Sequence, residues 1–121
     1  MTTDDRRRSE RRGRRAEMIV AWRYRCAGYR LIRHRYRCHE GEIDLIMRRR
    51  RQLVFIEVKY SSAGDPHHLE RVLPPPWQQN RIRAAAAHFL ATSHIPYDTS
   101  RIDVVVLSPP LRCTSFRDAI R

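Results

Sequence analysis

The chain of 121 residues carries 25 basic and 13 acidic side chains, a net charge of +12, with a hydrophobic content of 41%. This length predicts one domain that can bury a core without disulfides, and the hydrophobic content excludes a wholly disordered chain. The charge indicates a polyanionic partner, which we expect to be nucleic acid. No stretch approaches the ~20 apolar residues of a transmembrane helix or the ~7–15 of a secretory signal. We therefore expect no membrane partner and a cytoplasmic location.

The N-terminal part divides into a basic arm, a helix and a strand. Residues 1–15 have no apolar side chain after Met1 and are rich in arginine, which predicts a flexible arm that either grips phosphates or stays solvated. Apolar residues recur at three- and four-residue steps over 16–27, and Gly28 follows where a helix C-cap would lie. This spacing predicts an amphipathic helix. Residues 29–36 are expected to form a strand.

The clearest strands are expected at 42–47 and 52–60, joined at a hairpin tip by a run of arginines: Arg48, Arg49, Arg50 and Arg51. A two-residue turn in the middle of this run would place Asp44 opposite Phe55 and diagonal to Glu57. In that register the apolar faces of the two strands coincide, and so do the faces that carry charge. Alternation assigns the apolar faces to two sets of side chains: Ile43, Leu45 and Met47; Val54, Ile56 and Val58.

The C-terminal half predicts a helix followed by a strand. Residues 65–77 contain four prolines and are expected to form a loop. A helix is predicted over 78–94, with a buried stripe made by Ile82, Ala85, Ala86, Phe89 and Leu90. Residues 102–107 are a short apolar strand interrupted by Asp103, and a helix before this strand permits a parallel crossover. The expected order is helix, three strands, helix, strand, within a domain at 16–108 that a loosely held tail at 109–121 follows.

The cysteines and tryptophans suggest packing more than chemistry. Cys26, Cys38 and Cys113 are widely spaced and form no CxxC pair, which favours reduced thiols over disulfides or a zinc site. We expect them to pack as small hydrophobic residues. Trp22 and Trp77 could stack on bases, but core or partial-core packing is the more common use of tryptophan.

Two carboxylates and one amine share the charged side of the expected hairpin. Asp44 and Glu57 are costly to bury without partners, and a divalent cation would resolve that cost. Mg²⁺ prefers such hard oxygen ligands, and the carbonyl of Val58 could add a third. Lys59 could orient or deprotonate the attacking water and offset charge on a phosphate, while the metal would polarise the phosphorus centre.

Lys59 is the single lysine of a chain with 24 arginines. A bias towards arginine would act at this position too, so the position itself favours an amine. A buried lysine can lose its proton, whereas a guanidinium in practice cannot. The alternative is that Lys59 only forms an ion pair with Glu57 or Asp44, which an arginine would do at least as well.

Several segments together resemble one family. GEIDLI at 41–46 followed by LVFIEVK at 53–59 resembles the YraN family of small bacterial proteins, as do GYRLI at 28–32 and IDVVV at 102–106. That family is similar to archaeal Holliday-junction resolvases. The resemblance therefore implies an α/β, restriction-endonuclease-like fold, with a mixed sheet of about four to five strands, flanking helices and a PD-(D/E)xK active site.

The resemblance also implies roles for particular residues. Asp44 and Glu57 would bind Mg²⁺ or Mn²⁺, and Lys59 would be the catalytic amine. Glu17 resembles the acidic residue that resolvase-like nucleases bring to the metal from a helix; the alternative is a glutamate favoured by the helix macrodipole. Asp103 matches an acidic residue of the last strand, for which a structural hydrogen bond is the default.

Nucleic-acid contacts are expected at two places. The arginine run at 48–51, taken to lie near the metal site, could follow phosphates or could simply be an exposed turn. Gln79 keeps the place of the family's glutamine and could hydrogen-bond a phosphate or the site. Gln78 stands where the family usually has a lysine. Resolvases act as symmetric dimers, so the resemblance also implies a homodimer.

Two functions follow from the sequence and stay open at this point. The first is a metal-dependent endonuclease that hydrolyses phosphodiester bonds of DNA, including branched or otherwise structured DNA. The second is a non-catalytic nucleic-acid-binding protein that keeps the nuclease fold. Intact Asp44, Glu57 and Lys59 favour the first. Gln78 in place of a lysine, and the departure at Tyr60 from the family's usual EVKTR, give room to the second.

Overall fold

The computed structural model describes residues 3–61 and 73–121, without the side chains of residues 4–12. Its elements, in chain order, are α1 (Thr3–Cys26), β1 (Arg30–Cys38), β2 (Gly41–Arg49), β3 (Gln52–Tyr60), α3 (Pro76–Thr92), β4 (Thr99–Ser108) and β5 (Arg112–Phe116). The predicted α/β class is confirmed. Residues 65–72 of the loop predicted at 65–77 lie outside the described residues.

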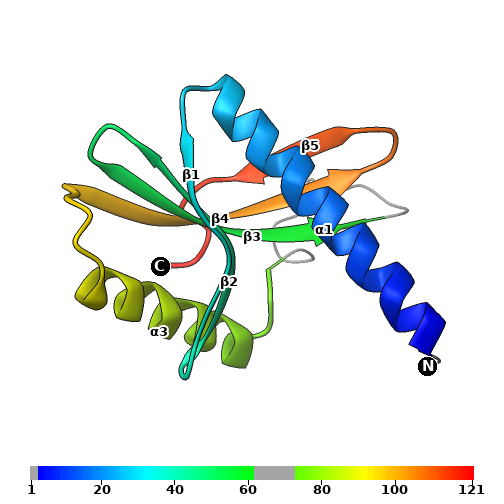
Figure 1. Ribbon diagram of the computed structural model, residues 1–121, viewed down its shortest axis with the longest axis horizontal. Helices are drawn as coiled ribbons and strands as arrows, with labels where there is room; N and C mark the ends of the chain where they lie inside the picture. The colour runs from blue at the N-terminus through cyan, green and yellow to red at the C-terminus, as the bar shows by residue number, and fades with distance from the viewer. Residues whose placement is uncertain (1–2, 62–72) are drawn as a thin grey trace.

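The strands form one open five-stranded sheet in the order β1-β2-β3-β4-β5 (Figure 1). β3 and β4 run parallel, and every other neighbouring pair is antiparallel. The parallel pair is joined through α3, because strands that run the same way need a crossover connection. The predicted mixed sheet with flanking helices is therefore confirmed.

The two helices cover opposite faces of the sheet (Figure 1). The buried cluster on the α1 side contains Val20, Ala21, Tyr29, Leu45, Met47, Val54, Ile56 and Val105. The buried cluster on the α3 side contains Ile43, Ile46, Leu53, Phe55, Ile82, Ala85, Ala86, Phe89, Ile102, Val104 and Ile120. The stripe predicted for the second helix is confirmed, with Leu90 partly buried against the α3-side cluster.

The predicted register of the β2–β3 hairpin is wrong. Arg50 and Arg51 form the turn, one residue later than predicted, and Ile46 pairs with Phe55 where Asp44 was expected. Arg50 takes φ 54°, the left-handed conformation that tight hairpin turns need. The pairing shifts by two residues, and the strand repeat is also two, so this shift alone moves no side chain to the other face of the sheet.

The alternation of β2 breaks at one point. Ile43 packs on the α3 side, opposite to the face predicted from Leu45 and Met47. Across from this point in β1, Arg35 has φ 56°, which a regular strand does not contain. This irregular residue accompanies the change of face, and it follows a further register shift between Leu31 and Arg33.

Both ends of the chain are more regular than predicted. α1 begins at Thr3, so the backbone of 3–15 is helical where the sequence predicted a flexible arm. Arginine is a good helix former and the segment has no proline. The expected loose tail is also wrong. Residues 112–116 form β5 against β4, and Ile120 is buried in the core.

Two further expectations concern thiols and membranes. All three cysteines are free thiols, as predicted, but Cys26 is exposed and Cys38 and Cys113 are only half-buried. Neither described helix is both long and apolar enough to traverse a bilayer.

Candidate active site

Asp44 and Glu57 come together where the β2–β3 ladder ends. They follow its last pair, Leu45 with Ile56, one on each strand. The backbone N–H of Val58 donates a hydrogen bond of 2.8 Å to Asp44 Oδ2. The structure therefore places the two predicted carboxylates on adjacent strands at one point of the sheet, closer in register than the sequence predicted.

The pKa values of Asp44 and Glu57 both lie above those of ordinary carboxyl groups, chiefly because both side chains are buried. Burial raises the pKa of Glu57, the neighbouring Asp44 raises it further, and Lys59 acts in the opposite direction. Burial also raises the pKa of Asp44, while the hydrogen bond from Val58 lowers it and the charge of Glu17 raises it. Such a pair favours a bound proton or a cation over two bare charges.

Glu57 is approached by two side chains besides Asp44. Gln78, in the first turn of α3, donates from Nε2 to Glu57 Oε1 at 3.2 Å. Lys59 Nζ lies 3.8 Å from the same oxygen. Gln79, which the sequence predicted for this region, instead donates to the carbonyl of Pro74 at 2.7 Å. Of the two glutamines, Gln78 is the one that reaches the carboxylates.

Lys59 is less buried than the amine chemistry predicted. Its side chain is 35% exposed, so the burial that was to release its proton is incomplete. Its 3.8 Å contact with Glu57 is the long end of an ion pair. The Lys59 side chain is therefore partly open to solvent beside Glu57.

Glu17 reaches the same region from α1. Its carboxylate is buried and accepts hydrogen bonds from Arg35 Nε at 2.9 Å and Nη2 at 3.3 Å; His34 Nε2 lies 2.6 Å from Oε1. A cavity of about 150 Å³ lies beside Glu17 and Asp44. Glu17 is thus near the pair and is itself held by basic groups of β1.

Sequence reasoning missed His34 and Arg35. Both lie in a strand so rich in arginine that neither is distinctive. The contact with Glu17 depends on the left-handed backbone of Arg35, at φ 56°, which no residue preference for arginine indicates.

The arginine run at 48–51 does not lie beside the carboxylates. Glu57 is five residues along β3 from Gln52, where the turn ends, a separation of roughly 17 Å at the usual strand rise. The expectation that the tip lies near the site is therefore wrong, because the carboxylates stand at the other end of the ladder.

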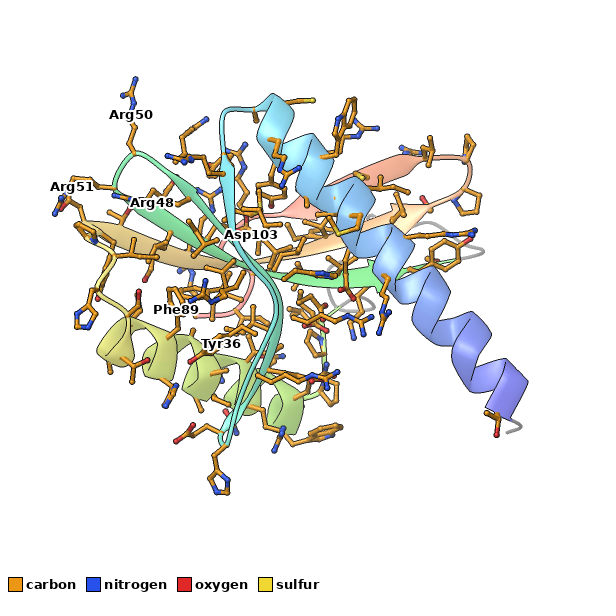
Figure 2. The ribbon with its side chains drawn as sticks, in the orientation of Figure 1. Tyr36, Arg48, Arg50, Arg51, Phe89 and Asp103 are labelled. Atoms are coloured by element: carbon orange, nitrogen blue, oxygen red, sulfur yellow. The ribbon has the colours of Figure 1, made fainter. Side chains whose placement is uncertain are left out.

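Contacts within the protein engage part of this arginine run. The guanidinium of Arg49 lies 4.6 Å from the centre of the Tyr29 ring. Arg51 Nε donates to Asp98 Oδ1 at 2.8 Å. Arg50 points away from the body of the protein at the tip (Figure 2). Arg50 is therefore the residue of this run whose side chain Figure 2 shows extending outward from the tip.

Asp103 has the structural role expected by default. It is fully buried and accepts hydrogen bonds of 2.9 Å from the Tyr24 hydroxyl, from Arg101 Nε and from the backbone N–H of Asp118. These donors come from α1, β4 and the segment after β5. Asp103, labelled in Figure 2, therefore ties three parts of the chain together.

Exposed aromatic side chains adjoin the residues around Glu57. Trp77, next to Gln78, is 65% exposed, and Tyr60, next to Lys59, is 42% exposed. Trp22 on α1 is exposed as well. The expectation that the tryptophans pack in the core is wrong for both.

Fold and site together define a small mixed α/β protein with a carboxylate pair and a lysine at one end of a hairpin. The model of a family described as "Uncharacterised protein family UPF0102" matches residues 16–107, so the chain belongs to this family. It is the YraN family of the resemblance, which is confirmed.

Related sequences align with most of the chain. A UPF0102 protein of Sphingopyxis alaskensis is 43% identical over 109 residues, covering 84% of each chain. A UPF0102 protein of Rhizorhabdus wittichii is 38% identical over 101 residues, covering 84% of this chain and 83% of the relative. One of Parvibaculum lavamentivorans is 41% identical, covering 82% and 73%. Their names state a family and no activity.

Proposed function

We propose that this protein is a metal-dependent endonuclease that hydrolyses phosphodiester bonds of DNA. The observation that carries the proposal is the meeting of Asp44, Glu57 and Lys59 at one end of the β2–β3 ladder. The same constellation is what the resemblance to resolvase-like nucleases implies. The net charge of +12 supports a polyanionic substrate.

The donor set fits Mg²⁺ or Mn²⁺. Two carboxylates with raised pKa values stand side by side, and such hard oxygen ligands suit these ions. When bound, the ion supplies Lewis-acid activation of the phosphoryl group. Hydrogen bonds orient both carboxylates: the Val58 N–H donates to Asp44, and the Gln78 amide donates to Glu57.

The remaining residues bind and orient the substrate. Lys59 has an exposed amine that can contact a phosphate oxygen and orient the attacking water. Tyr60 and Trp77 present aromatic faces on which bases can stack. Glu17 adds a third acidic group, which His34 and Arg35 keep in position.

A second basic surface extends the substrate contact. An open hollow of about 630 Å³ at the hairpin tip is lined by Arg49, Arg50, Arg51, Gln52, Asp98 and Thr99. Phosphates of a duplex long enough to reach from the carboxylates to this tip would meet both surfaces. Preference for branched DNA, and a homodimer that cuts two strands, rest on the resemblance to resolvases.

The second candidate is a nucleic-acid-binding protein without catalysis. Gln78 favours it, because this uncharged residue occupies the place of a family lysine and hydrogen-bonds Glu57. The incomplete burial of Lys59 favours it as well.

Cleavage of linear, nicked and four-way-branched DNA in Mg²⁺ and in Mn²⁺ distinguishes the two functions. We expect the wild type to cut, Glu57→Ala to lose cleavage and Lys59→Arg to lose at least ~100-fold in rate, all with binding retained. Asp118→Asn, a change in an exposed carboxylate that pairs with Arg121 near the end of the chain, is the control and should cut normally. Binding by the wild type without any cleavage would establish the second candidate. Absence of binding would reject both.

A further inference from the structure

A second cluster of metal-binding side chains lies away from the carboxylate pair. Cys38 ends β1, Glu40 lies in the turn that follows, and His88 lies on α3. One ligand atom from each comes within 4.8 Å of the others. Among the residues that the structure describes, no other group of three such side chains meets this criterion.

The imidazole of this cluster is already oriented by a tyrosine. The Tyr36 hydroxyl lies 2.6 Å from His88 Nδ1. The Tyr36 ring packs edge-on against Phe89, with ring centres 5.3 Å apart. Figure 2 labels both residues where the β1–β2 hairpin faces α3. A hydrogen bond at Nδ1 leaves Nε2 as the nitrogen that a metal can take, which is how metal-binding histidines are commonly held.

The backbone also brings the hairpin turn against the helix. A side chain at Gly41 would collide with the backbone carbonyl of Arg81, so the two backbones pass in close contact here. Arg81 and His88 are seven residues apart, two turns along α3, and so lie on one side of it. The elements that carry the three ligands are therefore fixed by contacts that need no metal.

We propose that Cys38, Glu40 and His88 bind one Zn²⁺ ion, with a water as the fourth ligand. A thiolate, an imidazole and a carboxylate are the donors that zinc takes, and Mg²⁺ does not select such a set. Ligand atoms around tetrahedral zinc are about 3.5 Å apart at the usual bond lengths. The Glu40 side chain is exposed and lies in a turn, so it can rotate towards the other two ligands.

The zinc ion would join the β1–β2 turn to α3. The first turn of α3 carries Gln78, which contacts Glu57, so the ion would steady one wall of the candidate active site. The proposal does not rest on nuclease activity. The sequence alone did not predict a zinc site, because the cysteines are widely spaced and form no CxxC pair. His88 lies fifty residues after Cys38, so cysteine spacing gives no information about it.

Cobalt(II) is the probe that reads this site specifically. Titration of the full-length protein with Co²⁺ should produce the near-ultraviolet thiolate-to-cobalt absorption band with one equivalent bound, and Zn²⁺ should displace it. Cys38→Ser should abolish the band, and His88→Ala and Glu40→Gln should each weaken Co²⁺ binding at least ~10-fold. Zinc should raise the unfolding temperature of the wild type and leave that of Cys38→Ser unchanged.

Matched variants separate this site from other ligands. Cys113→Ser changes a thiol of similar exposure and His94→Ala changes an exposed histidine, and both should keep the band. Glu57→Gln should keep it too, since the carboxylate pair contributes no thiolate. A wild type without the band, or a Cys38→Ser protein that retains it, overturns the proposal. If Cys38→Ser does not fold, unweakened binding by both His88→Ala and Glu40→Gln overturns it equally.

Discussion

Glu57 is a buried carboxylate whose neighbours are another carboxylate, an amide and an amine. Gln78 donates one hydrogen bond to it, and Lys59 offers only a long contact. Asp44 lies on the adjacent strand and raises its pKa. The protein without a bound cation therefore keeps a proton at this pair more readily than an isolated glutamate would.

This raised pKa predicts how stability depends on pH in metal-free buffer. The folded pKa of Glu57 lies above its ordinary value of 4.5, so the stabilising proton is fully present below that value and is lost as pH rises through the folded pKa. Glu57→Gln cannot ionise. It should therefore be more stable than the wild type above this window, by roughly 1–3 kcal/mol.

Urea unfolding with EDTA, from about pH 5 to pH 9, measures this difference. Asp98→Asn is the control, because this carboxylate is exposed and pairs with Arg51 at the hairpin tip. A Glu57→Gln advantage that is the same at every pH would contradict the assignment. So would an advantage that shrinks as the pH rises.

At the scale of elements, the β1–β2 hairpin depends on its contact with α3. Figure 1 shows the hairpin bending towards the helix. Tyr36 packs on Phe89, and Gly41 passes against the Arg81 carbonyl. These contacts hold α3 in the position from which Gln78 reaches Glu57.

Gly41→Ala tests this contact. The added methyl group meets the Arg81 backbone, which cannot move without shifting α3, so the free energy of unfolding should fall by about 1–3 kcal/mol. Gly13→Ala is the matched control. There the added atom would lie 3.5 Å from an Arg35 nitrogen, an ordinary contact, and alanine is the better helix former. Chemical denaturation compares the two, and a Gly41→Ala protein as stable as the Gly13→Ala protein would contradict the close approach.

Elements were predictable where local periodicity is strong. The α3 stripe shows its buried face directly in the spacing of apolar residues. The apolar runs of β2 and β3 mark them as strands, although helices bury both of their faces. β5 was missed because its five residues, RCTSF, follow two prolines and do not alternate regularly. β5 forms by antiparallel pairing with β4, which is a tertiary contact that its own residues do not indicate. The hairpin turn was predicted one residue too early, because arginine has no conformational preference that would identify Arg50 as the left-handed residue.

The whole molecule carries a charge of +12, which should dominate nucleic-acid binding. Affinity for a duplex should fall at least ~10-fold between 50 and 200 mM salt, since each neutralised phosphate releases counterions. Arg50→Gln should reduce the slope of log affinity against log salt by about 1. Arg51→Gln is the comparison, because Arg51 is paired with Asp98 and should change the slope less.

Fluorescence anisotropy with a labelled duplex measures these slopes. Glu57→Gln should bind with the same salt dependence as the wild type, because it lies in the carboxylate pair and not in the basic surface. Binding that does not respond to salt would contradict a contact through phosphates.

The candidate site was predictable in its residue types and only partly in its arrangement. Asp44, Glu57 and Lys59 stand in strands that the sequence shows clearly, so their nearness to one another along the hairpin could be inferred. The contacts of Glu17 with His34 and Arg35, and of Glu57 with Gln78, join separate elements. Local sequence carries no sign of such contacts.

The sequence by itself determined the strong positive charge, the core helical and extended segments between residues 16 and 107, and the family. These properties depend on composition and on the spacing of apolar residues within one element, which the chain carries locally. Only the tertiary structure decided the hairpin register, the choice of Gln78 over Gln79 and the meeting of Cys38, Glu40 and His88. Those depend on contacts between residues far apart in the chain, and packing of the helices against the sheet sets them.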